Sequence, residues 1–111
     1  MVKFEISKRV DEDFMFNLKA ANGEIIMTSQ GYSSKSACQH GIESVKANSF
    51  NKKMFISETA KDGSYYFNLT AVNTQVIGTS QMYTSTQGRD NGIASVRKNA
   101  PKAEIVDLSL N

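Results

Sequence analysis

The sequence is poor in the residues that mark several classes of protein. Its 111 residues include one cysteine, one proline and no tryptophan. A single cysteine excludes an internal disulfide scaffold and suits a reducing compartment. The remaining composition lies near the globular average, which argues against a collagen-like or disordered chain. A chain of this length is typical of one compact domain with its own core.

Strong charge of one sign and long apolar runs are also missing. Thirteen basic and eleven acidic side chains leave a net charge of +2. So small a charge gives little support for a nucleic acid or an anionic membrane as a partner. No segment approaches the roughly 20 apolar residues that cross a bilayer, and the first residues carry no run of the signal-peptide type. We therefore expect a cytoplasmic protein with no membrane partner.

The chain matches itself when it is shifted by 51 residues. Positions 4–50 and 55–101 align without a gap, and 18 of the 47 pairs are identical. We interpret the chain as one domain, residues 1–111, made of two tandem repeats and closed by a strand at about 104–110. A residue kept in both repeats serves the shared fold or a shared surface, whereas a residue found once cannot belong to a duplicated site.

Each repeat begins with the pattern of a half-buried strand. Apolar and polar residues alternate over 14–20 and again over 65–71, the period expected when successive side chains point to opposite faces. Asn22-Gly23 separates the first run from its return strand and predicts a hairpin with a type I′ turn. Asn73-Thr74 stands there in the second repeat, where threonine disfavours the positive φ of that turn.

A helix is expected after each hairpin. Ser34 and Ser85 are candidate N-caps, and the segments that follow carry apolar residues and glycine at helical spacing. Basic residues close both segments, as the helix dipole favours, and Pro101 bars further helix in the second repeat.

The expected elements define a fold class. Further strands are predicted at 2–7, 53–59 and 104–110, so the order is three strands, helix, three strands, helix, strand. The strand at 53–59 then both ends the first repeat and starts the second. This order predicts an α+β fold in which the two halves share a single, mainly antiparallel sheet with both helices on one face.

Three runs in the first repeat, which recur in modified form in the second, resemble the YegP-like family of small, mostly bacterial proteins. They are Phe16-Asn17-Leu18-Lys19-Ala20-Ala21-Asn22-Gly23-Glu24, Gly31-Tyr32-Ser33-Ser34-Lys35 and Gly41-Ile42-Glu43-Ser44-Val45-Lys46. The resemblance implies a tandem repeat of a three-strand–helix–strand motif whose C-terminal strands are exchanged between the halves. The family is of unknown function, so the resemblance implies no activity, cofactor or catalytic residue.

The residues offer no recognisable catalytic or metal site. Cys38 and His40 are two positions apart on an expected helix and point about 200° away from each other, so they cannot form a nucleophile–base pair. One histidine and one cysteine fall short of a zinc site. The acidic run Asp11-Glu12-Asp13 lacks the length and spacing of a calcium loop. We expect no enzyme, no metal and no cofactor.

Two kinds of repeated residue each have two explanations. Gly41 and Gly92 occupy the same interior position of the expected helices, where glycine costs about 1 kcal/mol relative to alanine. Either a close approach of the helix backbone to the sheet or the other helix, or a ligand on that backbone, would offset this cost. Tyr32 and Tyr83, just before the helices, either flank a binding face or fix the strand-to-helix corner.

The sheet face that the helices leave open is the candidate binding surface. A type I′ turn would pair Ala20 with Ile25 and assign to this face Met15, Asn17, Lys19, Ile26, Thr28 and Gln30, with Tyr66, Asn68, Thr70, Ile77, Thr79 and Gln81 as counterparts. Four of these six pairs are identical. Either Asn–Thr hydrogen bonds between strands or a polar platform for a partner explains this. The candidate binding residues are Asn17, Lys19, Thr28, Gln30, Tyr66, Asn68, Thr79 and Gln81.

These observations favour a non-enzymatic binding or interaction module. Its expected partner is a protein or a small polar ligand. A weak nucleic-acid binder, based on Lys19 and the slightly basic second half, is the first alternative, and an enzyme with an unfamiliar site is the second. Duplication favours a monomer because two fused halves supply what a homodimer would supply. An edge strand at either terminus is able to pair with another chain, so a homodimer is the alternative.

Overall fold

The computed structural model describes residues 1–109 and contains the predicted order of strands and helices. The first half holds β1 (Lys3–Lys8), β2 (Phe14–Lys19), β3 (Ile25–Thr28) and α1 (Lys35–Asn48). The second holds β4 (Phe55–Thr59), β5 (Tyr65–Thr70), β6 (Val76–Ser80), α2 (Thr86–Asn99) and the last strand β7 (Glu104–Asp107). Short 3₁₀ turns, η1 (Lys52–Met54) and η2 (Ala100–Lys102), follow the helices. Position 110 of the predicted last strand lies outside the described residues.

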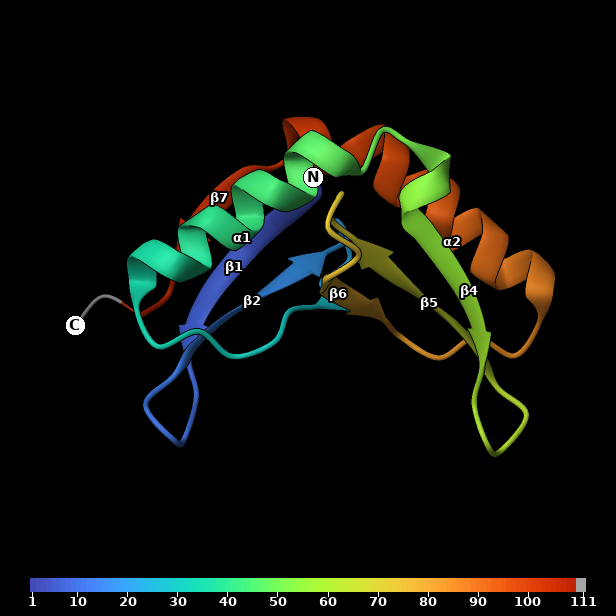
Figure 1. The fold of residues 1–111 in the computed structure, drawn as a ribbon, viewed down its shortest axis with the longest axis horizontal. Helices are drawn as coiled ribbons and strands as arrows, with labels where there is room; N and C mark the ends of the chain where they lie inside the picture. The colour runs from blue at the N-terminus through green and yellow to red at the C-terminus, as the bar shows by residue number, and fades with distance from the viewer. Residues whose placement is uncertain (110–111) are drawn as a thin grey trace.

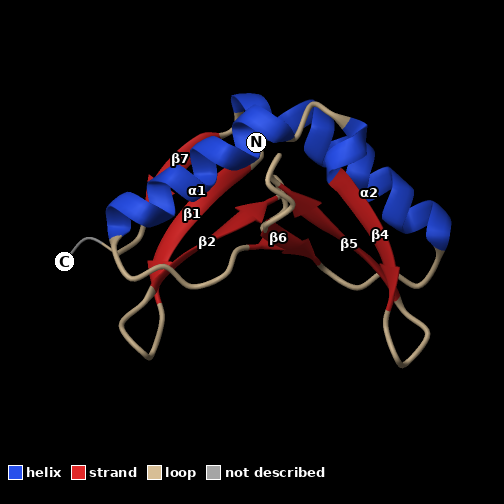
Figure 2. Ribbon diagram, viewed as in Figure 1, coloured by secondary structure: helices blue, strands red, loops and turns tan. Residues whose placement is uncertain are grey.

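One seven-stranded sheet runs through both halves in the order β4-β5-β6-β3-β2-β1-β7. The halves meet where β3 and β6 pair antiparallel, and β7 returns from the end of the chain to lie parallel to β1. Figure 1 shows the halves as two legs of an arch, with the tips of the β1–β2 and β4–β5 hairpins at their ends. The helices lie along the outer side of the arch (Figure 2), so the opposite face of the sheet is left open.

The helices begin as the sequence predicts. Ser34 Oγ accepts a hydrogen bond from Ala37 N, and Ser85 Oγ accepts one from Gly88 N, at 3.0 Å in each case. These bonds satisfy backbone donors that the first helical turn leaves without partners.

The turn between β2 and β3 differs from the prediction. Gly23 N donates to Ala20 O, Ala20 N donates to Glu24 O, and Gly23 has a φ of 86°. Asn22 has no positive φ, so the loop is a three-residue turn ending in a left-handed residue rather than a two-residue type I′ turn. The second half uses the same loop, with Thr74 at a φ of 70°.

The longer loop changes the register of the strands that follow. Leu18 pairs with Met27 and Lys19 with Ile25, which leaves Ile26 in a β-bulge. The predicted Ala20–Ile25 pair is therefore wrong, and so is the placement of Ile26 on the open face. Ile26 is buried and Ile25 is 40% exposed. The same bulge in β6 buries Ile77 and exposes Val76.

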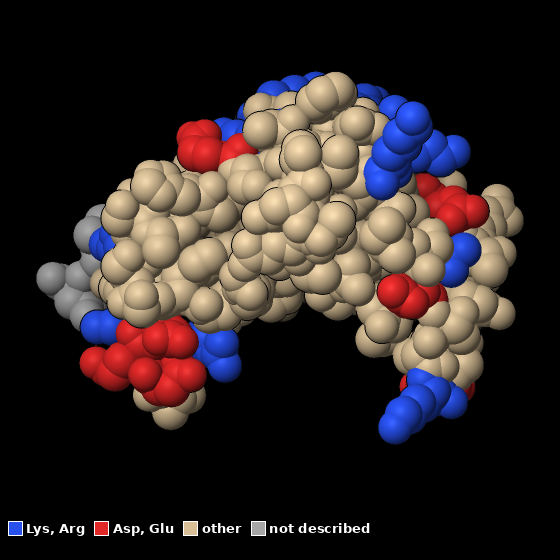
Figure 3. Space-filling view, in the orientation of Figure 1, with Lys and Arg blue, Asp and Glu red and all other residues tan. Residues whose placement is uncertain are grey.

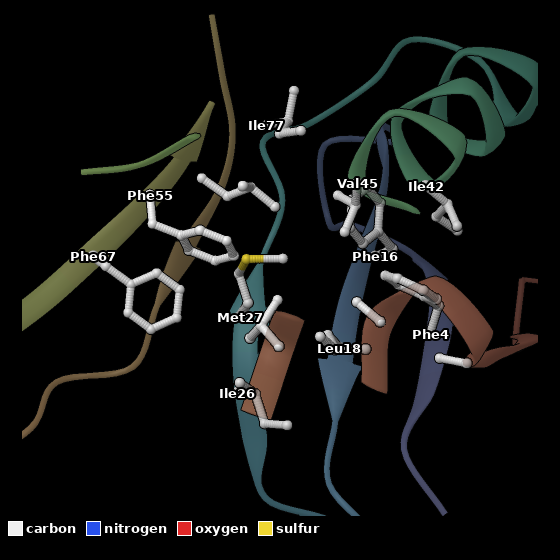
Figure 4. Close-up of a cluster of buried hydrophobic side chains, with 14 of the residues drawn as sticks. Phe4, Phe16, Leu18, Ile26, Met27, Ile42, Val45, Phe55, Phe67 and Ile77 are labelled. Atoms are coloured by element: carbon white, nitrogen blue, oxygen red, sulfur yellow. The ribbon is translucent and has the colours of Figure 1, made fainter. Parts of the chain in front are cut away.

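The core lies between the sheet and the helices and is continuous across the two halves. Phe4 packs edge-on against Phe16 in one half, as Phe55 does against Phe67 in the other. Met27 lies between the two groups (Figure 4). Gly78 makes room for it, because a Cβ there would stand 2.7 Å from Met27 Sδ. Burial of these side chains is the main stabilising term in a domain of this size.

Tyr32 and Tyr83 fix the corners between strand and helix. Tyr32 exchanges two backbone hydrogen bonds of 2.7 Å with Phe14, and its ring stacks on Phe16 at 6.3 Å between centroids. A Cβ at Gly41 would lie 2.7 Å from Tyr32 Cζ, and Gly92 stands in the same relation to Tyr83. The helix glycines therefore admit a tyrosine ring against the helix backbone. At Gly41 the Phe16 ring of β2 also approaches, at 3.2 Å from the position of a Cβ, in line with the predicted close approach of helix and sheet.

We expect Gly92→Ala to lower the free energy of unfolding by about 1–3 kcal/mol, because the added methyl overlaps the Tyr83 ring. Gly88→Ala on the same helix is the matched control. Ala37 occupies the equivalent position in α1, so this change should be neutral or stabilise by up to about 1 kcal/mol through helix propensity. Urea unfolding measures both variants, and a Gly92→Ala protein as stable as the wild type would contradict the packing explanation.

Candidate functional site

A row of four polar side chains crosses the centre of the open face. Asn17 pairs with Thr28, Thr28 with Thr79, and Thr79 with Asn68, so the row runs over β2, β3, β6 and β5. Residues directly opposite each other on neighbouring strands share a face. The fold thus brings together four of the predicted site residues, two from each half. We call this set the polar row.

Within each half the asparagine and threonine are hydrogen-bonded. Thr28 Oγ1 donates to Asn17 Oδ1 at 2.8 Å, and Thr79 Oγ1 donates to Asn68 Oδ1 at 2.7 Å. The cross-strand bond that the sequence pattern indicated is therefore present. It occupies the amide oxygens and fixes the side chains, while the amide N–H groups of both asparagines take no part in it. All four side chains are only partly buried, so the row is held in place and open to solvent.

A shallow depression of about 330 Å³ lies at the middle of the row, where β3 meets β6. Figure 3 shows the molecule hollowed between its two legs, below these strands in Figure 1. Gln30 and Gln81 line the depression beside the threonines, and Ile25 and Val76 add apolar surface that is 40% exposed at each residue. The depression therefore combines hydrogen-bonding groups with two symmetric apolar contacts.

The two ends of the polar row differ in charge. Glu5 of β1 lies directly opposite Asn17 of β2 and is 9% exposed. Its carboxylate pairs with Lys19 Nζ at 2.8 Å and Lys3 Nζ at 3.2 Å. The hydrogen bond from Lys19 holds the pKa of Glu5 below its ordinary value although burial opposes this. At the other end Ile56 pairs with Asn68 and is 43% exposed.

The remaining predicted residue, Tyr66, lies on β5 two positions before Asn68 and so on the same face. Sequence reasoning missed Glu5, Ile25 and Val76. The alternation of buried Phe4 and Ile6 in β1 was a usable signal for Glu5. Ile25 and Val76 reach the open face only because of the bulges, which the alternation of the sequence does not reveal.

The single cysteine and the single histidine both lie on α1, away from the open face. Cys38 is buried in α1 and His40 is exposed. Burial, with a smaller effect of the Asp107 carboxylate, raises the pKa of the Cys38 thiol to about 11. Within residues 1–109 no three His, Cys, Asp or Glu side chains gather closely enough to hold a metal ion. Neither helix of that range has the length and apolar character needed to cross a membrane.

We expect Glu5→Gln to lower the free energy of unfolding at pH 7 by about 1–3 kcal/mol, because it removes charge-assisted hydrogen bonds and leaves two lysines facing an uncharged amide. Glu5 has a lowered pKa in the folded state, so its stabilisation is present above its ordinary pKa near 4.5 and is lost as the pH falls through the lower folded value. Urea unfolding at pH 7 and pH 3 measures both proteins.

The matched control for this change is Glu12→Gln, whose side chain is 81% exposed and pairs only loosely with Lys8. Exposed pairs contribute little, so its stability should follow the wild type at both pH values. A Glu5→Gln deficit that stays unchanged between pH 7 and pH 3 would contradict the assignment of the stabilisation to the carboxylate charge.

Comparison with known proteins relates the whole chain to one group. The family model described as a domain of unknown function, DUF1508, matches residues 10–55 and again 60–107. A UPF0339 protein of Shewanella oneidensis is 51% identical over 106 residues, 96% of each chain. The UPF0339 protein YegP of Escherichia coli K12 is 48% identical over 104 residues, 94% of each chain.

Solved structures agree with the fold. The solution NMR structure of a UPF0339 protein from Shewanella oneidensis has a TM-score of 0.93 and 50% sequence identity, and the match covers 99% of this chain and 93% of that one. The solution NMR structure of yegP from E. coli, a protein of unknown function, has a TM-score of 0.92 and 45% identity, covering 99% and 95%. These similarities support the architecture but indicate no activity.

Proposed function

This chain belongs to the UPF0339 family with its DUF1508 repeats, and we propose that it is a non-enzymatic binding module that holds a partner protein on the open face of its sheet. The polar row carries the proposal. Its hydroxyl and amide groups are fixed by their mutual hydrogen bonds, so they lose little side-chain entropy when a partner binds. Fixed groups of this kind favour a specific contact over a solvated surface.

The shape of the face supports a protein rather than a small molecule. Small-molecule sites are usually enclosed and bury most of the ligand. The depression at the β3–β6 contact is shallow and lined by both halves. Its amide and hydroxyl groups match the donors and acceptors of a peptide backbone, and the exposed side chains of Ile25 and Val76 suit the apolar side chains of a protein segment.

The charges on this face favour a protein over a nucleic acid. Phosphate binding depends on cations that are free to replace counterions. Lys19 and Lys3 both pair with Glu5, and the tip of the β1–β2 hairpin carries Asp11, Glu12 and Asp13, which form the acidic patch at the end of one leg in Figure 3. A polyanion lying along the face would meet these carboxylates.

The non-enzymatic part of the proposal rests on the two tyrosines that an enzyme would most readily use. Tyr32 and Tyr83 pack against helix glycines and phenylalanine rings. Burial raises the pKa of the Tyr32 phenol, which makes it a poorer base at neutral pH. We further propose a cytoplasmic monomer. The single cysteine and the pairing of the two halves through β3 and β6 support this.

Selection of binding peptides from a random display library, followed by amide chemical-shift mapping, tests the proposal. We expect a selected peptide to shift residues of β2, β3, β5 and β6. Asn17→Ala with Asn68→Ala should weaken it at least about tenfold, the effect of losing two neutral hydrogen bonds. Gln39→Ala with Gln87→Ala, exposed amides on the helices, is the matched control and should bind like the wild type.

Mixed-sequence single-stranded RNA and DNA are titrated in parallel at low and moderate salt. Shifts on the open face that persist at moderate salt would indicate that the partner is a nucleic acid rather than a protein. Peptides that bind the double asparagine variant as well as the wild type, or that shift only helix residues, would overturn the role of the polar row.

A further inference from the structure

One edge of the sheet is open although the equivalent edge in the other half is covered. Strand β1 is flanked by β2 on one side and by β7 on the other. Its counterpart β4 is paired with β5 alone within residues 1–109. The reason lies in the connectivity. In the alignment of the two halves, β7 corresponds to residues 53–56, which belong to η1 and the start of β4. The first half therefore has no separate strand that could pair with the outer edge of β4.

The pairing of β7 with β1 shows how such an edge is covered. Phe4 pairs with Ile105 and Ile6 with Asp107, and Leu108 N donates to Ile6 O at 2.8 Å. Lys35 at the start of α1 anchors the strand through a 2.8 Å ion pair with Asp107. Under this cover both Phe4 and Ile6 are completely buried.

The equivalent place beside β4 is a groove. Ser57, which corresponds to Ile6, is exposed. It pairs with Phe67, whose N–H is turned toward β6 and donates to Ser80 Oγ. Ser57 therefore directs its own N–H and C=O away from β5, toward the open edge. A space of about 290 Å³ follows this edge beneath α2 and is lined by Lys52, Phe55, Ser57, Asp90, Ile93, Ala94 and Arg97.

Basic groups lie near both ends of the groove, and apolar groups lie between them. Lys52 and Arg97 line the groove where β4 begins. Near the other end the Arg89 guanidinium, whose side chain is 14% exposed and lies just outside the lining, reaches Glu58 O. Phe55 and Ile93 form the apolar middle. Asp90 also lines the groove and contacts Arg89 at 3.5 Å. An extended segment with acidic ends and an apolar middle would complement this arrangement, and Glu104-Ile105-Val106-Asp107 of β7 has that pattern.

We propose that the β4–α2 groove binds an extended, acid–apolar–apolar–acid segment of a partner protein as an additional strand parallel to β4. Main-chain hydrogen bonds to Ser57 would supply affinity, and the basic ends would set register. The groove lies at the edge of the sheet on the helix side, so this interaction is separate from the open face. A β7 strand from a second copy would first have to leave β1 and break its own Asp107–Lys35 pair, which favours a foreign segment.

The probe is a synthetic peptide with the sequence of residues 101–109, titrated into the intact, isotope-labelled protein. We expect amide shifts in β4 and α2 with none in β2, β3 or β6, the central strands of the open face. Changing the peptide residues Glu104→Lys and Asp107→Lys should abolish binding. Shifts in β1 and α1, which would mean that the peptide displaces the resident β7, or no shifts at all, would overturn the proposal.

Two variants test the contacts separately. Ser57→Pro removes the edge N–H at a position where an edge strand tolerates proline, and Arg97→Glu reverses a charge that lines the groove; each should weaken the peptide at least tenfold. Lys98→Glu, an exposed neighbour outside the groove, is the matched control and should bind as the wild type does. Unchanged affinity in both test variants, or peptide-independent self-association in sedimentation, would contradict the proposal.

Discussion

The antiparallel contact between β3 and β6 makes one domain out of two repeats, and the rest of the structure depends on it. Met27 pairs with Ser80 and Thr28 with Thr79. On the covered face, Met27 crosses from one half toward the other in the space that Gly78 leaves. Each half alone would offer one helix over three strands, too little burial to offset the entropy of ordering the chain. Sharing one core removes that difficulty.

The same contact creates the polar row, one of the two surfaces for which we infer a function. On the open face it aligns Thr28 with Thr79, so two short Asn–Thr pairs become one continuous polar row. At the outer edges the connectivity makes the halves differ, because β7 covers β1 while the first half has no separate strand to cover β4. The duplicated sequence is therefore symmetric at its centre and asymmetric at its ends. Equivalent positions of the two halves also differ there: Glu5 corresponds to Ile56, and Cys38 corresponds to Arg89.

Much of the fold followed from local patterns in the sequence. Period-two alternation located the strands, and serines before helical spacing located both N-caps. The same alternation assigned Asn17, Thr28, Asn68 and Thr79 to the open face, but it misplaced Ile26 and Ile77 there. The register was less predictable, because Asn-Gly suits both a two-residue turn and a three-residue loop, and only the folded loop decides which isoleucine is buried. The packing of Tyr32 on Gly41, the burial of Glu5 and the open edge of β4 depend on contacts between segments far apart in the chain.

Native-state hydrogen exchange tests most directly whether the two repeats form one cooperative unit. The amides of Phe16 and Leu18 in β2 and of Phe67 and Leu69 in β5 report on the two halves separately. If the β3–β6 contact and the shared core hold the domain together, both sets exchange through openings of equal free energy that match global unfolding in urea. A free energy of opening several kcal/mol lower for one half than for the other would contradict this account.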